Sequence, residues 1–97
     1  MGKKKLIRFR ENATFPELFE PPALELLAKD HELKGRWAKG YFGNDNPIIL
    51  ELGCGRGEYT AGLAQLFPGQ NFVGVDIKGS RLNFGVKAIR QAGIKNA

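Results

Sequence analysis

The sequence predicts an α/β fold that holds the first strand–helix–strand–helix portion of a doubly wound parallel sheet. Two short apolar runs with the composition of strands lie at residues 48–52 and 71–76. A stretch with apolar residues at helical spacing follows each run, over residues 58–67 and 80–93. Strands that alternate with helices in this way pair in parallel, because each helix returns the chain to the end of the sheet where the next strand begins.

The first strand and helix rest on clear local signals. Residues 48–52 are apolar apart from one glutamate and are bounded by turn residues, which predicts a buried strand. In the helix that follows, Tyr59, Leu63 and Leu66 are predicted to share one face. Pro68 and Gly69 then end this helix.

The end of the chain is predicted to continue the same pattern. Ser80 is a candidate N-terminal cap of the last helix, which ends by Gly93. Residues 94–97 resemble the lead-in to a third strand. Two strands cannot form a sheet that is buried on both faces, so we expect a C-terminal part of the protein beyond Ala97.

Residues 1–46 are predicted to form a basic N-terminal arm with a short helix and an aromatic linker. The helix begins at Pro22 and ends near Gly35, with Leu24 and Leu27 on its apolar side. The linker carries three aromatic residues that we expect to pack the arm onto the domain rather than to stack on a base: Trp37, Tyr41 and Phe42. His31 is interpreted as a surface residue without partners for a metal or a nucleophile.

Charge and cysteine content limit the possible functions. Fifteen Lys and Arg residues against ten Asp and Glu give a net charge of +5, which fits a polyanionic partner such as nucleic acid. No stretch approaches the roughly 20 apolar residues of a membrane span. The single Cys54 excludes an internal disulfide and a cysteine-built zinc site. We therefore expect a soluble cytoplasmic protein with no metal and no membrane contact.

The turn after the first strand is a candidate ligand site. Gly53, Gly55 and Gly57 give the spacing G-x-G-x-G, whereas the dinucleotide pattern G-x-G-x-x-G would need glycine where Glu58 stands. Glu51 and Glu58 flank the turn and would repel a pyrophosphate, so the site favours a cationic ligand. S-adenosylmethionine fits, because it carries both an ammonium and a sulfonium group.

Asp76 supplies the second half of this predicted site. It stands at the end of the adjacent strand, where an acidic side chain accepts hydrogen bonds from ribose hydroxyls. Each residue also has an ordinary structural interpretation: Glu51 as a surface carboxylate, Asp76 as a turn former, and the glycines as turn residues. Cys54 is interpreted mainly as a small buried filler rather than a nucleophile.

Residues 51–58, ELGCGRGE, followed by residues 71–82, NFVGVDIKGSRL, resemble the bacterial tRNA (guanine-N7-)-methyltransferases. The resemblance covers nearly the whole chain, but only the N-terminal half of such an enzyme. It implies a Rossmann-like class I methyltransferase fold, with residues 47–97 as the first half of the domain that binds S-adenosylmethionine. By this resemblance the cofactor-binding residues are Glu51, Gly53, Cys54, Gly55, Gly57, Asp76 and Ile77.

The resemblance implies methyl transfer to N7 of a variable-loop guanine in tRNA. N7 carries a lone pair and can attack a sulfonium methyl without losing a proton, so no strong base is needed. The residue that holds adenine and an Asp-Pro motif would follow later in the chain. We therefore expect the catalytic residues beyond Ala97, and a fragment that is inactive alone.

Basic residues are the candidate contacts to tRNA phosphates. Those on a mobile arm are Lys3, Lys4, Lys5, Arg8 and Arg10, and those near the ligand edge are Arg56, Lys78 and Arg81. Terminal charge runs are often only solvated, so this interpretation of the arm stays open. Two other functions also stay open: a methyltransferase that uses S-adenosylmethionine on another substrate, and a non-catalytic nucleic-acid-binding module.

Overall fold

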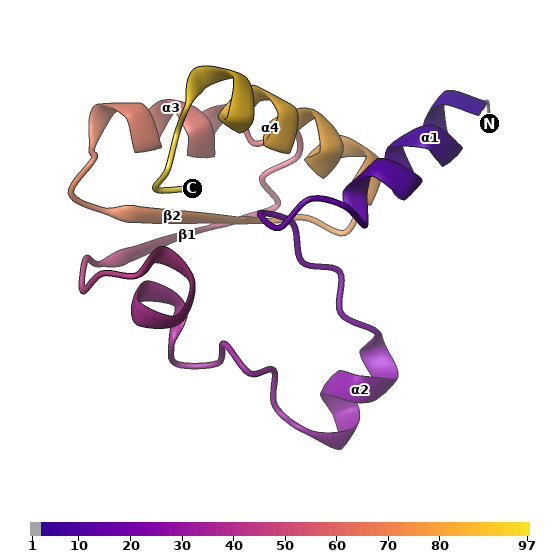
Figure 1. The fold of residues 1–97 in the computed structure, drawn as a ribbon, viewed down its shortest axis with the longest axis horizontal. Helices are drawn as coiled ribbons and strands as arrows, with labels where there is room; N and C mark the ends of the chain where they lie inside the picture. The colour runs from indigo at the N-terminus through magenta and orange to yellow at the C-terminus, as the bar shows by residue number, and fades with distance from the viewer. Residues whose placement is uncertain (1–2) are drawn as a thin grey trace.

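The computed structural model describes residues 3–97 of the chain. The elements follow in the order α1 (Lys3–Asn12), α2 (Ala23–Ala28), the π-helix η1 (Trp37–Phe42), β1 (Ile48–Leu52), α3 (Glu58–Leu66), β2 (Asn71–Val75) and α4 (Gly79–Ala92). Helices α3 and α4 lie on one side of the two strands, and α2 lies on the other side (Figure 1).

The two strands form a parallel sheet, which confirms the predicted strand–helix–strand–helix order. Ile48 pairs with Asn71 at one end of the register and Leu52 with Val75 at the other. Helix α3 connects the strands and packs on β2 and on α4. The arrangement is a partial Rossmann-like fold.

The prediction that β1 is buried is wrong for the described residues. Ile48 and Ile49 are each 38% exposed, Leu50 is 56% exposed and Leu52 is 76% exposed. In residues 3–97 the two long helices of the strand–helix repeat lie on one side of the sheet only (Figure 1). An apolar strand pattern indicates which side chains favour burial, but residues 3–97 leave much of this apolar surface of β1 uncovered.

Small side chains, rather than the predicted large ones, form the buried face of α3. Thr60 and Ala64 are buried, whereas Tyr59 and Leu66 are 73% and 72% exposed. A Cβ added to Gly74 of β2 would lie 3.1 Å from Oγ1 of Thr60. The helix therefore approaches the strand closely, which needs small residues on both sides of the contact.

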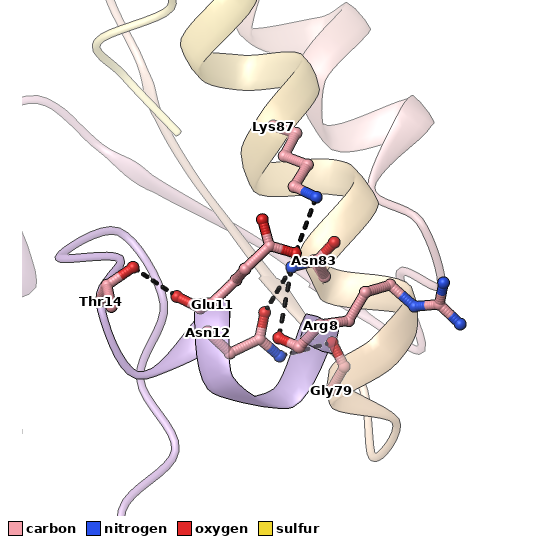
Figure 2. A network of polar contacts seen from close by, with 7 residues as sticks. All are labelled: Arg8, Glu11, Asn12, Thr14, Gly79, Asn83 and Lys87. Atoms are coloured by element: carbon pink, nitrogen blue, oxygen red, sulfur yellow. Dashed lines mark hydrogen bonds and ion pairs between the residues drawn. The ribbon is translucent and has the colours of Figure 1, made fainter. Parts of the chain in front are cut away.

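Helix α1 was not predicted, and it is held against α4 instead of forming a mobile arm. The Asn12 amide, 2% exposed, donates to the carbonyl oxygen of Gly79 at 2.8 Å. The fully buried Asn83 amide donates to Asn12 Oδ1 at 3.0 Å and to the Arg8 carbonyl oxygen at 3.4 Å (Figure 2). Lys87 adds an ion pair to Glu11 at 2.9 Å.

The segment between α2 and β1 also differs from its prediction. Helix α2 ends at Ala28 because Lys29 is extended, and its Leu24 and Leu27 are 80% and 83% exposed. Residues predicted as a loop form the π-helix η1, which ends at Gly43 in the left-handed region. The expected burial of an amphipathic face on α2 is therefore absent from the described structure.

Five aromatic rings form a cluster, three of them from η1, and the cluster includes His31. Phe19 meets Trp37 and Tyr41 edge-on at centroid distances of 5.2 and 5.3 Å. The His31 ring lies parallel to Trp37 at 6.3 Å, and its Nδ1 accepts a hydrogen bond from the Leu33 N–H. The interpretation of His31 as a plain surface residue is therefore wrong, because it is half-buried in this cluster.

The end of the chain lies beside the edge of β2 that faces away from β1. The Asn71 N–H donates towards β1, at Pro47, so the next amide in the strand points to the opposite edge. That amide, of Phe72, donates to the Asn96 carbonyl oxygen at 2.7 Å. Residues 94–97 do not form a strand. Their one hydrogen bond to the edge of β2 is of the kind that a third strand would make.

Candidate functional site

The glycine turn folds over the end of β2. The N–H groups of Gly53 and Cys54 both donate to the Val75 carbonyl oxygen, at 2.7 and 2.9 Å. Gly55 has φ +58°, a conformation that L side chains rarely adopt, and a Cβ there would have no atom within 4 Å. The backbone of the turn therefore faces open space, where a ligand can approach it closely.

Asp76 is fixed to the same turn through both of its carboxylate oxygens. Oδ2 accepts the Gly55 N–H at 2.8 Å, and Oδ1 accepts the Lys78 N–H at 2.9 Å. These hydrogen bonds, first from Lys78 and then from Gly55, lower the pKa of Asp76 below its ordinary value. The carboxylate is thus ionised and oriented, and each oxygen keeps a lone pair for a further donor.

The Asp76 interaction also explains where the last helix begins. The predicted cap Ser80 makes no capping hydrogen bond, and Lys78 occupies the N-cap position. Asp76 receives the Lys78 N–H just before α4 starts, so the side chain that orders this helix entry is a predicted site residue. The local fold and the candidate site therefore depend on the same carboxylate.

Glu51 lies in β1 next to the turn and contacts α3. Its Oε2 accepts a hydrogen bond from Oγ1 of the buried Thr60 at 3.2 Å. Sequence reasoning missed Thr60, whose only local signal is its place in the first turn of the helix after the glycines. The hydroxyl orients Glu51 and leaves its second oxygen available.

The thiol of Cys54 is packed between the turn and β2. A Cβ on Gly74 would come within 2.8 Å of Cys54 Sγ, so the strand has glycine where the thiol sits. Burial first, then the negative charges of Asp76 and Glu51, raise the pKa of Cys54. The structure therefore agrees with a packing role and gives the thiol little nucleophilic character.

We expect alkylation of Cys54 by iodoacetamide to be slower at pH 8 than that of free cysteine, because less of the thiol is ionised. The rate should continue to rise with pH above the ordinary thiol pKa. Mass spectrometry of the peptide that contains Cys54 measures this reaction. A rate that levels off below that pKa would contradict the packing role.

The two residues after Asp76 point outward. Ile77 is 97% exposed, an unusual position for a large apolar side chain, and Lys78 is also exposed. Arg81, one turn into α4, is exposed as well and adds a small favourable charge effect on Asp76. The structure thus places Ile77, Lys78 and Arg81 around the same carboxylate.

The other predicted RNA contacts lie on α1 and in the glycine turn. Lys4 and Lys5 are on α1, with Lys5 Nζ 6.0 Å from the Phe9 ring centroid, and the Lys3 side chain is outside the described part. The Arg56 guanidinium lies 4.6 Å from the centroid of Phe84 in α4. The Arg8 guanidinium of α1 lies 5.1 Å from the same centroid, so α1 and the turn place basic side chains beside one ring.

An apolar cavity of about 340 Å³ runs from the turn to the aromatic cluster. Cys54, Gly57 and Asp76 line one part of it, and Phe19 and Trp37 line another. The predicted glycine site thus borders a cavity that also reaches the aromatic cluster. The sequence did not predict this connection.

Residues 3–97 show neither a metal-binding cluster nor a membrane-spanning helix. They contain no group of three or more His, Cys, Asp or Glu side chains placed to hold a metal ion. None of the helices described is long and apolar enough to cross a membrane.

The chain has a glycine turn after its first strand and an acidic residue at the end of its second strand. Comparison with known proteins assigns a chain with these features to a family. The family model described as "Putative methyltransferase" matches residues 45–97, and the chain belongs to that family. No solved structure matches the chain.

Curated relatives narrow the similarity to one kind of methyltransferase. The chain is 52% identical over 96 residues to a tRNA (guanine-N(7)-)-methyltransferase of Bacteroides thetaiotaomicron, covering 99% of this chain and 38% of the relative. It is 49% identical over 95 residues to the enzyme of that name from Christiangramia forsetii, covering 98% and 42%. It is 37% identical over 90 residues to the enzyme of that name from Streptococcus pneumoniae, covering 93% of this chain and 41% of the relative. The resemblance seen in residues 51–58 and 71–82 is confirmed, and the chain spans about two fifths of these relatives.

Proposed function

We propose that the protein carrying this chain is an S-adenosylmethionine-dependent methyltransferase that acts on guanine N7 in tRNA. The observation that carries the cofactor half of the proposal is the Asp76 carboxylate, held by Gly55 and Lys78 at the open side of the glycine turn. The tRNA half is supported by the names of the relatives and by the net charge of +5. A cytoplasmic location fits a tRNA-modifying enzyme.

The residues at the turn fit S-adenosylmethionine. The free lone pairs of Asp76 suit ribose hydroxyls, and the open backbone at Gly53 and Gly55 suits the methionine end. Glu51, oriented by Thr60, can accept the ammonium group, and the exposed Ile77 offers an apolar surface to the adenine ring. When bound, this cofactor supplies an electrophilic methyl group.

The part of the reaction that these residues perform is positioning. Guanine N7 needs no deprotonation, so the rate depends on holding the methyl group in line with the N7 lone pair. Asp76 and Glu51, on adjacent strands, would hold the two ends of the cofactor. Gly53, Gly55, Cys54 and Gly57 shape the backbone between them.

Methyl transfer to total tRNA by the full-length protein tests the proposal. We expect 7-methylguanosine in the digested tRNA, measured by mass spectrometry, and no product without S-adenosylmethionine. Cofactor binding without methylation of tRNA would favour a methyltransferase with another substrate. Binding of tRNA without binding of the cofactor would favour a non-catalytic module.

Asp76→Ala in the full-length protein is expected to weaken S-adenosylmethionine binding about tenfold to hundredfold, as loss of a charge-assisted hydrogen bond does. Calorimetric titration measures this change. Asp45→Ala is the matched control, because within residues 3–97 that exposed carboxylate forms an ion pair with Lys39 alone. Equal affinities for wild type and Asp76→Ala would exclude the ribose role.

The lowered pKa of Asp76 also sets the direction of a pH effect. A carboxylate with a lowered folded-state pKa contributes stability above its ordinary pKa, and that contribution is lost as the pH falls through the lowered value. We therefore expect the Asp76 contribution to cofactor affinity to stay constant from about pH 5 to pH 8. A loss of that contribution near pH 6 would contradict the hydrogen-bonded geometry.

A further inference from the structure

Two arginines from distant parts of the chain converge on one aromatic ring beside the glycine turn. The Arg56 guanidinium lies 4.6 Å from the Phe84 ring centroid, and the Arg8 guanidinium lies 5.1 Å from the same centroid. Arg8 belongs to α1, Arg56 to the turn and Phe84 to α4. We propose that Arg8, Arg56 and Phe84 form a binding site for a backbone phosphate of the RNA substrate. Arg8 and Arg56 are called the arginine pair.

Specific packing holds the arginine pair in place. A Cβ on Gly85 would lie 2.6 Å from the Arg56 carbonyl oxygen, so this glycine lets α4 touch the turn and places Phe84 beside Arg56. On the other side, the Asn83 amide donates to the Arg8 carbonyl oxygen and to Asn12. Both backbones are therefore fixed, which reduces the entropy that the two side chains lose on binding.

Within residues 3–97, no acidic side chain forms an ion pair with Arg8 or Arg56. The ion pairs formed by residues 3–97 involve Lys34, Lys39, Lys87 and Arg90. Two like charges beside one ring repel each other, and an anion that binds near both offsets this repulsion. An exposed aromatic ring stabilises guanidinium groups without neutralising them, so their charge remains available to a ligand.

Arg8 also has a buried polar atom that no described residue pairs with. Its Nε is buried without a hydrogen-bond partner, although buried N–H groups are almost always paired. Its guanidinium extends away from the network that joins Asn12 and Asn83 (Figure 2). A phosphate accepts several hydrogen bonds from planar guanidinium forks, and the terminal N–H groups of Arg8, rather than the buried Nε, would donate them.

The position suits RNA rather than a free anion. Arg56 follows Gly55, whose N–H binds Asp76, so the arginine pair lies next to the proposed cofactor site. A phosphate held there would bring a nucleotide of the substrate beside the methyl group. The inference rests on the proposed function, and it adds the residues that anchor the RNA backbone.

Salt-dependent binding of total tRNA to the full-length protein tests the arginine pair. Loss of one phosphate contact lowers the slope of log affinity against log salt by about 0.7–0.9. We expect Arg8→Gln and Arg56→Gln each to lower the slope by about this amount and the affinity about tenfold, with S-adenosylmethionine affinity unchanged. Arg36→Gln, the same change at an exposed arginine outside the pair, should keep the wild-type slope.

Two more variants separate binding from folding. Arg8→Lys keeps the charge and should keep the slope while losing part of the affinity, because lysine lacks the planar fork. Phe84→Leu keeps both arginines and should weaken tRNA binding a few-fold at an unchanged slope. Thermal midpoints identify any variant that fails to fold.

Wild-type slopes in both Arg→Gln variants would overturn the proposal. A loss of S-adenosylmethionine affinity with unchanged tRNA binding would also overturn it, since the arginines would then serve the cofactor. If the wild-type protein methylates tRNA in either case, the proposed function stands without the arginine pair. A wild-type protein that neither binds nor methylates tRNA would remove both.

Discussion

Gly85→Ala is expected to destabilise the protein by about 1–2 kcal/mol and to weaken S-adenosylmethionine binding. The added Cβ would lie 2.6 Å from the Arg56 carbonyl oxygen and 3.2 Å from its carbon, and neither backbone atom belongs to a flexible side chain. Such overpacking costs about 1–3 kcal/mol or more, and the better helix propensity of alanine offsets about 1 kcal/mol. Urea denaturation measures the stability, and calorimetric titration measures the cofactor affinity.

The cofactor effect follows from where the collision occurs. Gly85 in α4 lies against Arg56 and Gly57, so its Cβ must push the glycine turn away from the helix. That movement would shift Gly55, whose N–H fixes Asp76. The substitution therefore acts on the candidate site without touching the space that a ligand would occupy.

Gly62→Ala is the matched control, because it makes the same change inside α3. A Cβ there meets no atom within 4 Å, so the variant should be more stable than the wild type by about 0.5–1 kcal/mol. Opposite signs for the two glycines would establish that contact with the turn, rather than helix propensity, decides the effect. Equal stabilities would contradict the close packing of α4 on the turn.

Local signals were enough to predict the strands and the glycine turn. The runs that became β1 and β2 are short and apolar, and the glycines between β1 and α3 have the composition of a turn. Because parallel strands end at the same edge of a sheet, the approach of Asp76 to the turn also followed from the sequence. The hydrogen bond between Asp76 and Gly55 is the geometric form of that prediction.

Contacts between distant segments could not be predicted in the same way. The amides of Asn12 and Asn83 meet across 71 positions of sequence, and neither asparagine belongs to an apolar pattern. The aromatic rings of Phe19, His31 and Trp37 come from three segments separated by turns. Periodicity describes one element at a time, so it cannot show which elements pair.

Exposure was the other property that the pattern could not determine. Leu52 is 76% exposed and Leu66 is 72% exposed, although both are typical core residues. Burial depends on what covers an element, and residues 3–97 leave these side chains open. The small residues Thr60 and Ala64 are buried instead. A helix that packs close to a strand needs small side chains at the contact, whether or not they are apolar.

Asn83→Ala is expected to destabilise the protein by about 2–3 kcal/mol and to release α1. The fully buried amide donates to Asn12 Oδ1 and to the Arg8 carbonyl oxygen, and its removal leaves Asn12 Oδ1 buried without a donor (Figure 2). An unsatisfied buried acceptor costs about 1–3 kcal/mol, and the lost side-chain volume adds to this. Hydrogen exchange of the α1 amides should accelerate more than exchange in β2.

Lys87→Ala removes the other kind of contact between the same two helices. The Lys87–Glu11 ion pair is well exposed, with side chains 48% and 34% accessible, so its loss should cost less than about 1 kcal/mol. If α1 is held chiefly by this ion pair, Lys87→Ala would release the helix and Asn83→Ala would not.

The two variants also separate docking of α1 from its charge. Asn83→Ala leaves Arg8 in the chain but frees its backbone, so tRNA affinity should fall although no charge is lost. Lys87→Ala lowers the net charge by one and leaves Glu11 without a partner, so any loss of tRNA affinity that comes from charge alone should appear in this variant. Loss of affinity in the first variant alone would mean that the order of α1, as well as its basic residues, contributes to RNA binding.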